Sequence, residues 1–236
     1  MKRLSHLRPE ENPLETGFLM NKTRLFSRKN EVFLEESESI LVIRKRFRKP
    51  SSFLKERDYL SYLKEKIEVP SILSEDIERH ELILQFLDGP PIIQLDTKEF
   101  LIAVSMASIW LRKLHFLGVV KGDCNPRNFI MHRGKIYGID FEEASLLIDG
   151  SYDPIKDLVD LISTTAVTLY TRGLHPLKSL ELSLGHVLES YGAHPLPEIN
   201  YKELIKNFLR DRKKFRPERS HIFDALIEET KNIEIL

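Results

Sequence analysis

Apolar residues between about residue 19 and residue 86 fall in short runs that are separated by polar turns. Leu25-Phe26 forms one such run and residues 32–34 form the next, with the polar stretch 27–30 between them. Two short apolar runs around a polar turn predict a β-hairpin. We therefore expect the chain to begin with antiparallel strands.

A third strand and a helix follow in the same region. Residues 40–43 predict the strand, and we expect Pro50-Ser51-Ser52 to stop it and to provide the N-cap of a helix. The next residues recur at helical spacing, at Phe53, Glu56, Leu60 and Leu63. Strand character returns at 82–87, and Gly89-Pro90-Pro91 ends it.

The pattern becomes helical after this break. Residues 97–116 predict an amphipathic helix, a polar loop follows at 121–128, and a second hairpin is predicted from the runs 129–131 and 136–139. From Pro154 onward the pattern is rich in helix. We predict an α+β fold of two lobes, with a small antiparallel sheet and one helix in residues 1–88 and mainly helices in residues 89–236.

Composition adds limits to this picture. The chain has 236 residues and a formal net charge of zero, so no overall field favours nucleic acid or an anionic membrane. Its longest apolar stretch, residues 101–111, is shorter than the roughly 20 residues that cross a bilayer. The single cysteine, Cys124, cannot form an internal disulfide. We expect a cytoplasmic protein without a membrane span, in which Cys124 is a buried thiol.

Three polar residues carry the candidate chemistry. Asp123 and Asn128 lie five positions apart in the polar loop, and Asp140 ends the second predicted hairpin. We therefore expect two carboxylates and an amide to converge across this short hairpin. Metal-assisted phosphoryl transfer requires such groups, because a carboxylate orients the acceptor hydroxyl and oxygen ligands hold Mg²⁺ on the nucleotide phosphates.

This segment resembles the catalytic loop and metal motif of protein kinases. It is more similar to the small-molecule and atypical branch, which includes aminoglycoside and choline phosphotransferases, lipopolysaccharide-core kinases and RIO-type kinases. The resemblance implies a protein-kinase-like fold that uses ATP and Mg²⁺. It implies Asp123 as the catalytic base, with Asn128 and Asp140 as metal ligands.

The first lobe supports the same resemblance, which covers about residues 19–170. Lys45 stands where kinases have the lysine that binds the α- and β-phosphates, and strand alternation turns its basic neighbours to the opposite face. Glu56 is the expected partner of this lysine, with Glu65 and Glu68 as later alternatives. The segment with Gln85 and Leu87 resembles the hinge that meets adenine.

In the second lobe, Asp157 resembles the helix aspartate that supports the catalytic loop from below. Asp160 is the competing choice, and Asp157 also suits a plain charge at a helix N-terminus.

Three departures from the kinase pattern stand out. Lys121 replaces the usual His or Tyr, Glu142 replaces the glycine of Asp-Phe-Gly, and the first hairpin lacks a glycine-rich loop. We therefore expect phosphate contacts from Arg28, Lys29 and backbone amides. Glu142 and its neighbour Glu143 are either additional metal ligands or residues with a solvated or salt-bridged role.

The leading hypothesis is a Mg-ATP-dependent phosphotransferase acting on a hydroxyl of a small molecule or glycan. The alternatives are a RIO-like or tRNA-modification-complex-type Ser/Thr kinase or ATPase, and a pseudokinase that serves as a nucleotide-binding scaffold. Retention of the lysine, the glutamate and the three loop residues argues against the scaffold. The basic stretch 206–219 is typical of a solvated helix face, with nucleic acid, a protein complex or a phosphorylated substrate as alternative partners.

Overall fold

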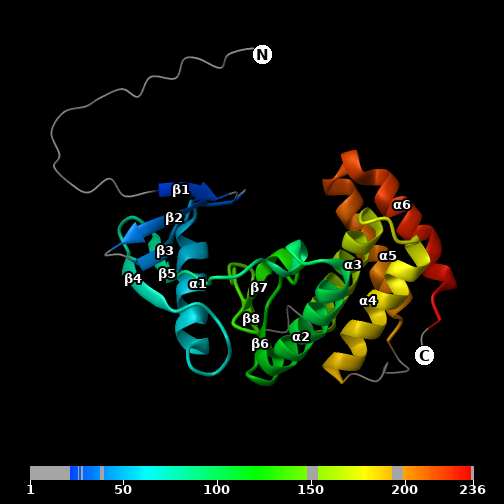
Figure 1. Ribbon diagram of the computed structural model, residues 1–236, viewed down its shortest axis with the longest axis horizontal. Coiled ribbons are helices and arrows are strands. Elements are labelled where there is room, and N and C mark those ends of the chain that lie inside the picture. The colour runs from blue at the N-terminus through cyan, green and yellow to red at the C-terminus, as the bar shows by residue number, and fades with distance from the viewer. Residues whose placement is uncertain are drawn as a thin grey trace, which may run out of the picture.

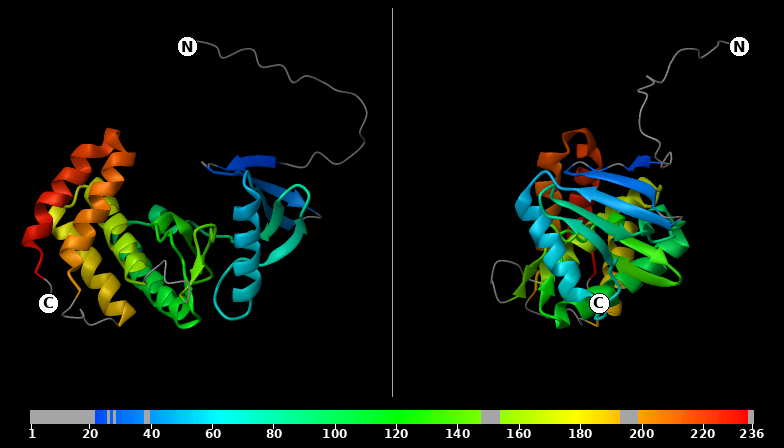
Figure 2. Two further views of the ribbon diagram at one scale, coloured as in Figure 1. Left: turned by 180° about the vertical axis from the view of Figure 1, so that it is seen from behind. Right: turned by 90° about the vertical axis from the view of Figure 1, so that its left-hand side faces the viewer.

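The structure is a computed structural model that describes residues 22–25, 27, 29–37, 40–147, 154–192 and 199–234. Arg28, one of the predicted phosphate-binding residues, lies outside the described residues, and so does residue 19, where the predicted sheet region begins. A small sheet stands at one end of the molecule and a group of helices at the other (Figure 1). Figure 2 shows the same division from behind. The predicted two-lobed α+β fold is confirmed.

The sheet has five strands in the order β1-β2-β3-β5-β4, and all neighbouring pairs are antiparallel. The strands are β1 (Lys22–Leu25), β2 (Glu31–Ser37), β3 (Ile40–Arg46), β4 (Ile72–Asp76) and β5 (Glu81–Gln85). The predicted hairpin is confirmed, because Leu25 pairs with Val32. Strand β4 was not predicted. Its sequence Ile-Leu-Ser-Glu-Asp is largely polar because it lies at the sheet edge and pairs only with β5.

Alternation along β3 separates two groups of charges. Arg44 binds Glu35 at 2.6 Å and also contacts Glu81. Lys45, the next residue, projects to the other face and reaches Glu56. The predicted opposition of Lys45 and its basic neighbour is confirmed, so Arg44 does not compete with Lys45 for the carboxylates below the sheet.

Helix α1 (Pro50–Leu63) buries the four residues predicted from helical spacing, which are Phe53, Glu56, Leu60 and Leu63. The predicted N-cap within Pro50-Ser51-Ser52 is wrong, because the N-cap is Lys49 and the helix begins at Pro50. Proline suits the first helical position, since its fixed φ is already helical and its missing N–H is not needed there. The helix therefore starts on this proline.

The middle of the molecule is built on helix α2 (Thr97–Phe116), which has the predicted bounds and whose N-cap Asp96 accepts a hydrogen bond from the Glu99 N–H at 2.9 Å. Trp110 of α2 packs directly on Gly138, where a Cβ would lie 2.3 Å from the indole ring. Around α2 lie η1 (Ile92–Gln94), β6 (Val119–Val120), η2 (Pro126–Asn128), β7 (Phe129–His132), β8 (Lys135–Gly138) and β9 (Ser145–Leu146). The second predicted hairpin is confirmed by the pairing of β7 with β8. The ladder of β6 with β9 was not predicted, since each strand has only two residues.

The far end of the molecule is helical, as predicted from Pro154 onward. It contains α3 (Pro154–Thr171), α4 (Pro176–Tyr191), α5 (Tyr201–Phe215), η4 (Pro217–Arg219), α6 (Ser220–Glu229) and η5 (Thr230–Asn232). One apolar core runs from Phe53 under the sheet to Leu226 in the last helix. Within the described residues, no helix is long and apolar enough to cross a bilayer.

Candidate active site

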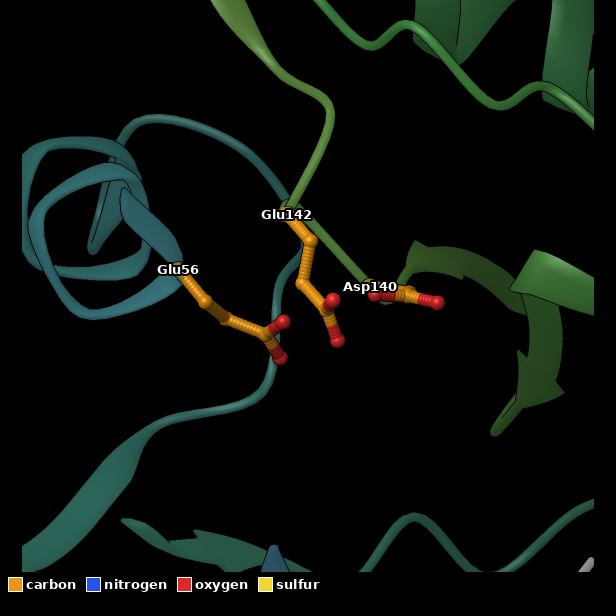
Figure 3. A group of neighbouring side chains, drawn as sticks. All are labelled: Glu56, Asp140 and Glu142. Carbon is orange, nitrogen blue, oxygen red and sulfur yellow. The ribbon is translucent and has the colours of Figure 1, made fainter. Parts of the chain in front are cut away.

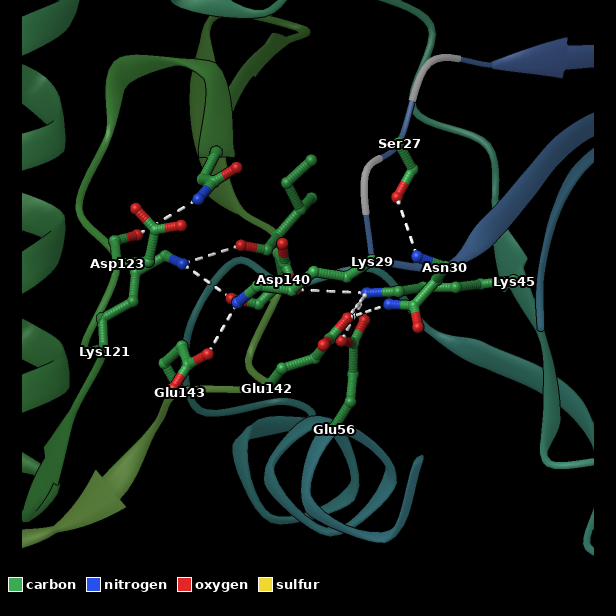
Figure 4. Close-up of polar contacts among 12 residues, drawn as sticks. Ser27, Lys29, Asn30, Lys45, Glu56, Lys121, Asp123, Asp140, Glu142 and Glu143 are labelled. Atoms are coloured by element: carbon green, nitrogen blue, oxygen red, sulfur yellow. Dashed lines mark hydrogen bonds and ion pairs between the residues drawn. The ribbon is translucent and has the colours of Figure 1, made fainter. Parts of the chain in front are cut away.

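Lys45, in strand β3, contacts three carboxylates at once. Its Nζ lies 2.6 Å from Glu56 Oε2, 3.2 Å from Asp140 Oδ1 and 2.9 Å from Glu142 Oε1. The three acidic side chains converge from α1 and from the segment after β8 (Figure 3), and Figure 4 shows Lys45 among them. Asp140 keeps 36% of its side chain exposed, whereas Glu56 and Glu142 are buried. We call these four residues the Lys45 cluster.

The three carboxylates alone have the geometry of a cation site, because one oxygen from each lies within 4.8 Å of the others. The Lys45 ammonium contacts all three of them, so this cation is already provided by the chain. Glu142 is therefore a salt-bridged residue in this structure, which is one of the two predicted readings.

Charge balance within the Lys45 cluster shifts three pKa values. Burial opposes the charge of Lys45, but its three acidic neighbours outweigh burial and raise the pKa of the lysine. Burial raises the pKa of Glu56 to about 7 against the opposing effect of Lys45. Burial also acts on Asp140, but Lys45 and then Lys121 lower its pKa overall. Asp140 is therefore ionised more readily than Glu56.

Two buried carboxylates of α3 hold the loop that carries Asp123. Asp157 accepts hydrogen bonds from the backbone N–H of Lys121 at 2.7 Å and of Gly122 at 2.9 Å. Asp160 accepts one from the N–H of Cys124 at 2.8 Å. Both competing residues thus support the loop, each at its own position, and the loop conformation on either side of Asp123 is fixed.

Hydrogen bonds to main-chain groups hold the segment with Asp123 and Asn128 next to the segment with Asp140. The Asn128 side chain donates to the Asp123 carbonyl at 3.2 Å, and the Asn128 carbonyl accepts from the Ile139 N–H at 3.0 Å. Asp123 is half-buried, and no described residue donates a hydrogen bond to its carboxylate. The three residues predicted to converge are therefore held in two adjacent segments.

Gly122 allows the two segments to approach. It has φ of +82°, and a Cβ would lie 2.4 Å from the Glu143 carbonyl oxygen. Only glycine fits this backbone conformation and this contact. The sequence contains a signal for this role, the Gly-Asp pair itself, but Gly122 was not among the predicted site residues.

The turn between β1 and β2 reaches down to the segment after Asp140. Lys29 Nζ lies 2.6 Å from Glu143 Oε1, and the Asn30 amide donates to Glu142 (Figure 4). Two departures from the kinase pattern are therefore in direct contact. Glu142, which replaces the glycine of Asp-Phe-Gly, binds Asn30 in the turn that stands where kinases have the glycine-rich loop. Sequence reasoning did not identify Asn30, because the pairing joins positions 112 residues apart.

The predicted hinge residues differ in their bonding. Gln85 is engaged with Ser71, whose carbonyl accepts from the Gln85 N–H at 2.9 Å and whose N–H donates to the Gln85 side chain at 3.3 Å. Leu87 is buried, and its backbone N–H makes no hydrogen bond to any described residue. Among the described residues, the Gln85 N–H is therefore engaged and the Leu87 N–H is not.

The other acidic alternatives and the thiol make no contact with Lys45 among the described residues. Glu65 is exposed, and Glu68 binds Lys135 at 3.3 Å. Cys124 is completely buried, and burial raises its pKa well above the ordinary value, as expected of an unreactive thiol.

The basic stretch 206–219 is largely neutralised by acidic partners. Lys213 binds Asp224 at 2.6 Å and Lys214 binds Asp211 at 2.8 Å. Arg212 turns inward and lies 3.5 Å from Asp160 Oδ1. Burial and then the charge of Asp123 raise the pKa of Asp160 to about 7, and Arg212 opposes this rise.

No protein-family model matches the chain, and no curated protein matches it in sequence. Among solved structures, the chain is similar to that of the gentamicin-APH(2")-IIa complex. The similarity covers 92% of this chain and 93% of that chain, with a TM-score of 0.57 and 14% sequence identity. The fold is protein-kinase-like. At this identity the likeness concerns the fold alone, so the activity must be argued from the residues of the site.

Proposed function

We propose that the protein is a Mg-ATP-dependent phosphotransferase whose acceptor is a hydroxyl group of a small molecule or glycan. The observation that carries this proposal is the contact of Lys45 with both Glu56 and Asp140. It joins the sheet, helix α1 and the segment after β8, so that a phosphate-binding cation and a metal-binding carboxylate meet at one point.

Each residue has a defined task in the proposed reaction. Lys45 binds the α- and β-phosphates, and its bond to Glu56 fixes the ammonium. Asp123 orients the acceptor hydroxyl and receives its proton, while the hydroxyl oxygen forms the bond to the γ-phosphorus and the bond from that phosphorus to the ADP oxygen breaks. The Leu87 backbone is the proposed contact for adenine, with Lys29 at the phosphates.

Asn128 and Asp140 fit Mg²⁺ by the chemistry of their donor atoms. Both offer oxygen, the ligand that Mg²⁺ prefers, and the charges of Lys45 and Lys121 keep the Asp140 carboxylate ionised. The Asn128 nitrogen donates to the Asp123 carbonyl, which leaves the amide oxygen as the atom that would face a metal. When bound, the ion neutralises negative charge on the transferred phosphoryl group.

The acceptor class is supported by the fold comparison and by the pairing of the basic residues. The neighbouring structure is a complex with gentamicin, a small molecule, and the two chains match over nearly their whole lengths. Five of the six Lys and Arg residues of helix α5 lie within 4 Å of an acidic side chain, which leaves little unpaired charge for nucleic acid on that helix.

A nucleotide-binding scaffold is the second candidate, and Glu142 favours it. This carboxylate contacts Lys45 and Asn30 where a glycine would leave room for phosphates. A scaffold of this kind binds ATP without transferring its phosphoryl group.

The experiment compares ATP turnover by the wild-type protein and by Asp123→Asn, with ATP binding measured for both. We expect turnover to fall by a factor of about 10² to 10⁴ while binding stays intact, because the variant keeps the shape and loses the proton acceptor. Turnover that persists in Asp123→Asn contradicts the assigned mechanism. Binding without turnover in the wild-type protein, across a panel of sugars, aminoglycosides and choline-like alcohols, supports the scaffold.

A further inference from the structure

Lys121 is a completely buried lysine whose side chain hydrogen-bonds to main-chain oxygens. Its Nζ donates to the carbonyl of Ile139 at 2.7 Å and to that of Asp140 at 2.9 Å. The rings of Phe141 and Phe129 lie nearby, with centres 5.2 Å and 5.9 Å from the nitrogen. Among the described residues no carboxylate forms a salt bridge with this ammonium. Its surroundings thus differ from those of Lys45.

The two carbonyl groups belong to the peptide units on either side of the Asp140 Cα. Peptide units are planar, so the orientations of these two units set φ and ψ of Asp140. One ammonium that binds both carbonyl oxygens therefore fixes the backbone conformation at this residue.

Asp140 needs such a restraint. Its φ of +64° lies in the left-handed region, which residues with a side chain seldom adopt. Conformations of this kind persist where the surrounding structure holds them. The backbone conformation also sets the direction of the Cα–Cβ bond, and here the carboxylate extends to Lys45 at 3.2 Å.

Lys121 is itself firmly anchored. Its backbone N–H donates to Asp157 at 2.7 Å, and it stands two residues before Asp123. A buried cation is costly to desolvate, so packing alone does not explain a lysine at this position. The lysine is therefore best explained by what its two hydrogen bonds position.

We propose that Lys121 is the positioning residue of the metal-nucleotide site, holding Asp140 in the left-handed conformation that directs its carboxylate into the site. This inference rests on the proposed function, because it assumes that Asp140 binds the metal of a nucleotide complex. It adds a link between the Asp123 loop and the metal ligand, made by a residue that touches neither substrate nor metal.

The test measures Mn²⁺ binding by electron paramagnetic resonance in the presence of saturating ADP. The full chain is compared with Lys121→Met, Lys121→His and Asp140→Asn, and Lys135→Met, an exposed lysine of the β7–β8 hairpin, is the matched control. We expect Lys121→Met to weaken Mn²⁺ binding about 10-fold or more, the usual effect of losing a residue that orients a metal ligand. Lys121→His keeps a donor at this position without a permanent charge and should recover most of the loss.

Amide hydrogen exchange at Asp140 and Phe141 gives a second readout, which we expect to accelerate in Lys121→Met and to return toward wild type in Lys121→His. Should Lys121→Met fail to fold, Lys121→Leu, which also lacks a hydrogen-bond donor, takes its place with the same expectations.

The outcomes separate the two proposals. If Asp140→Asn binds Mn²⁺ as tightly as the wild-type protein, the metal assignment of the proposed function fails. If Asp140→Asn loses Mn²⁺ binding while Lys121→Met keeps both affinity and amide protection, the Lys121 inference is overturned. If Lys121→His behaves like Lys121→Met in both readouts, the charge of the lysine and not its hydrogen bonding is responsible, which also overturns the inference.

Discussion

Two buried lysines of one site are stabilised in opposite ways. Lys45 lies among three carboxylates, whereas Lys121 lies between two carbonyl oxygens and two aromatic rings. Both reach Asp140, but Lys45 binds its side chain and Lys121 binds its backbone. The two lysines therefore have different roles in the site. Lys45 balances the charge of the carboxylates, and Lys121 fixes the backbone conformation at Asp140.

The largest effect on stability is expected at Lys45. Lys45→Met leaves Glu56 and Glu142 buried without their cation, and an uncompensated buried charge typically costs about 3–5 kcal/mol. Urea unfolding at pH 8 measures this cost. The control is Lys135→Met, which removes a surface ion pair and should cost less than about 1 kcal/mol. Equal costs for the two variants would refute the ionic description of the Lys45 cluster.

The second effect is a pH dependence caused by Asp160, a buried carboxylate beside the loop. Its pKa is raised from 3.8 to about 7, so the folded state binds its proton more tightly than the unfolded chain. The resulting stability is present below about pH 4 and is lost as the pH rises to about 7, up to about 4 kcal/mol for a shift of this size. Asp160→Asn keeps an acceptor for the Cys124 N–H and should flatten this part of the profile in urea unfolding. An unchanged slope would contradict the raised pKa.

The third effect is the loss of stability that we expect when Lys121, like Lys45, is replaced by methionine. Lys121→Met leaves two carbonyl groups unbonded but no carboxylate unpaired, so we expect a cost of about 1–3 kcal/mol, below that of Lys45→Met. Unfolding under the same conditions decides the order. A larger loss for Lys121→Met would show that the two lysines do not divide the tasks as described.

The smallest effect is expected at Lys29, in the turn between β1 and β2. Lys29 and Glu143 are both more than half exposed, and exposed ion pairs contribute less than about 1 kcal/mol. Lys29→Ala should therefore leave the unfolding midpoint nearly unchanged, while ATP binding weakens if Lys29 contacts the phosphates as proposed. Calorimetric titration measures the affinity for ATP. An affinity equal to that of the wild-type protein would contradict the proposed contact of Lys29 with the phosphates.

Sequence reasoning succeeded where a signal is local. The phase of α1 predicted that Glu56 faces inward, and alternation along β3 predicted that Lys45 and Arg44 diverge. The limits appear where partners are distant. No local pattern links Asn30 to Glu142, or Lys121 to the carbonyls around Asp140, since the fold alone brings them together. The departures from the kinase pattern drew attention to Lys121, Glu142 and the first turn. They did not reveal that Glu142 is bonded to Asn30 of that turn.

The N-cap error has a different origin. Pro50-Ser51-Ser52 carries both a stop signal for β3 and a start signal for α1, and the proline's helical φ decided between them. Strand β4 was missed because an edge strand with an exposed face lacks the apolar run that identifies an inner strand.

The most direct test of the account is the affinity for ATP with and without Mg²⁺, measured by calorimetry for the wild-type protein and for Asp140→Asn. Both lysines act on Asp140, so the account predicts that Mg²⁺ strengthens ATP binding to the wild-type protein and that this gain disappears in Asp140→Asn, while binding without Mg²⁺ persists. A wild-type protein that does not bind ATP, or an Asp140→Asn variant that keeps the full Mg²⁺ gain, would contradict it.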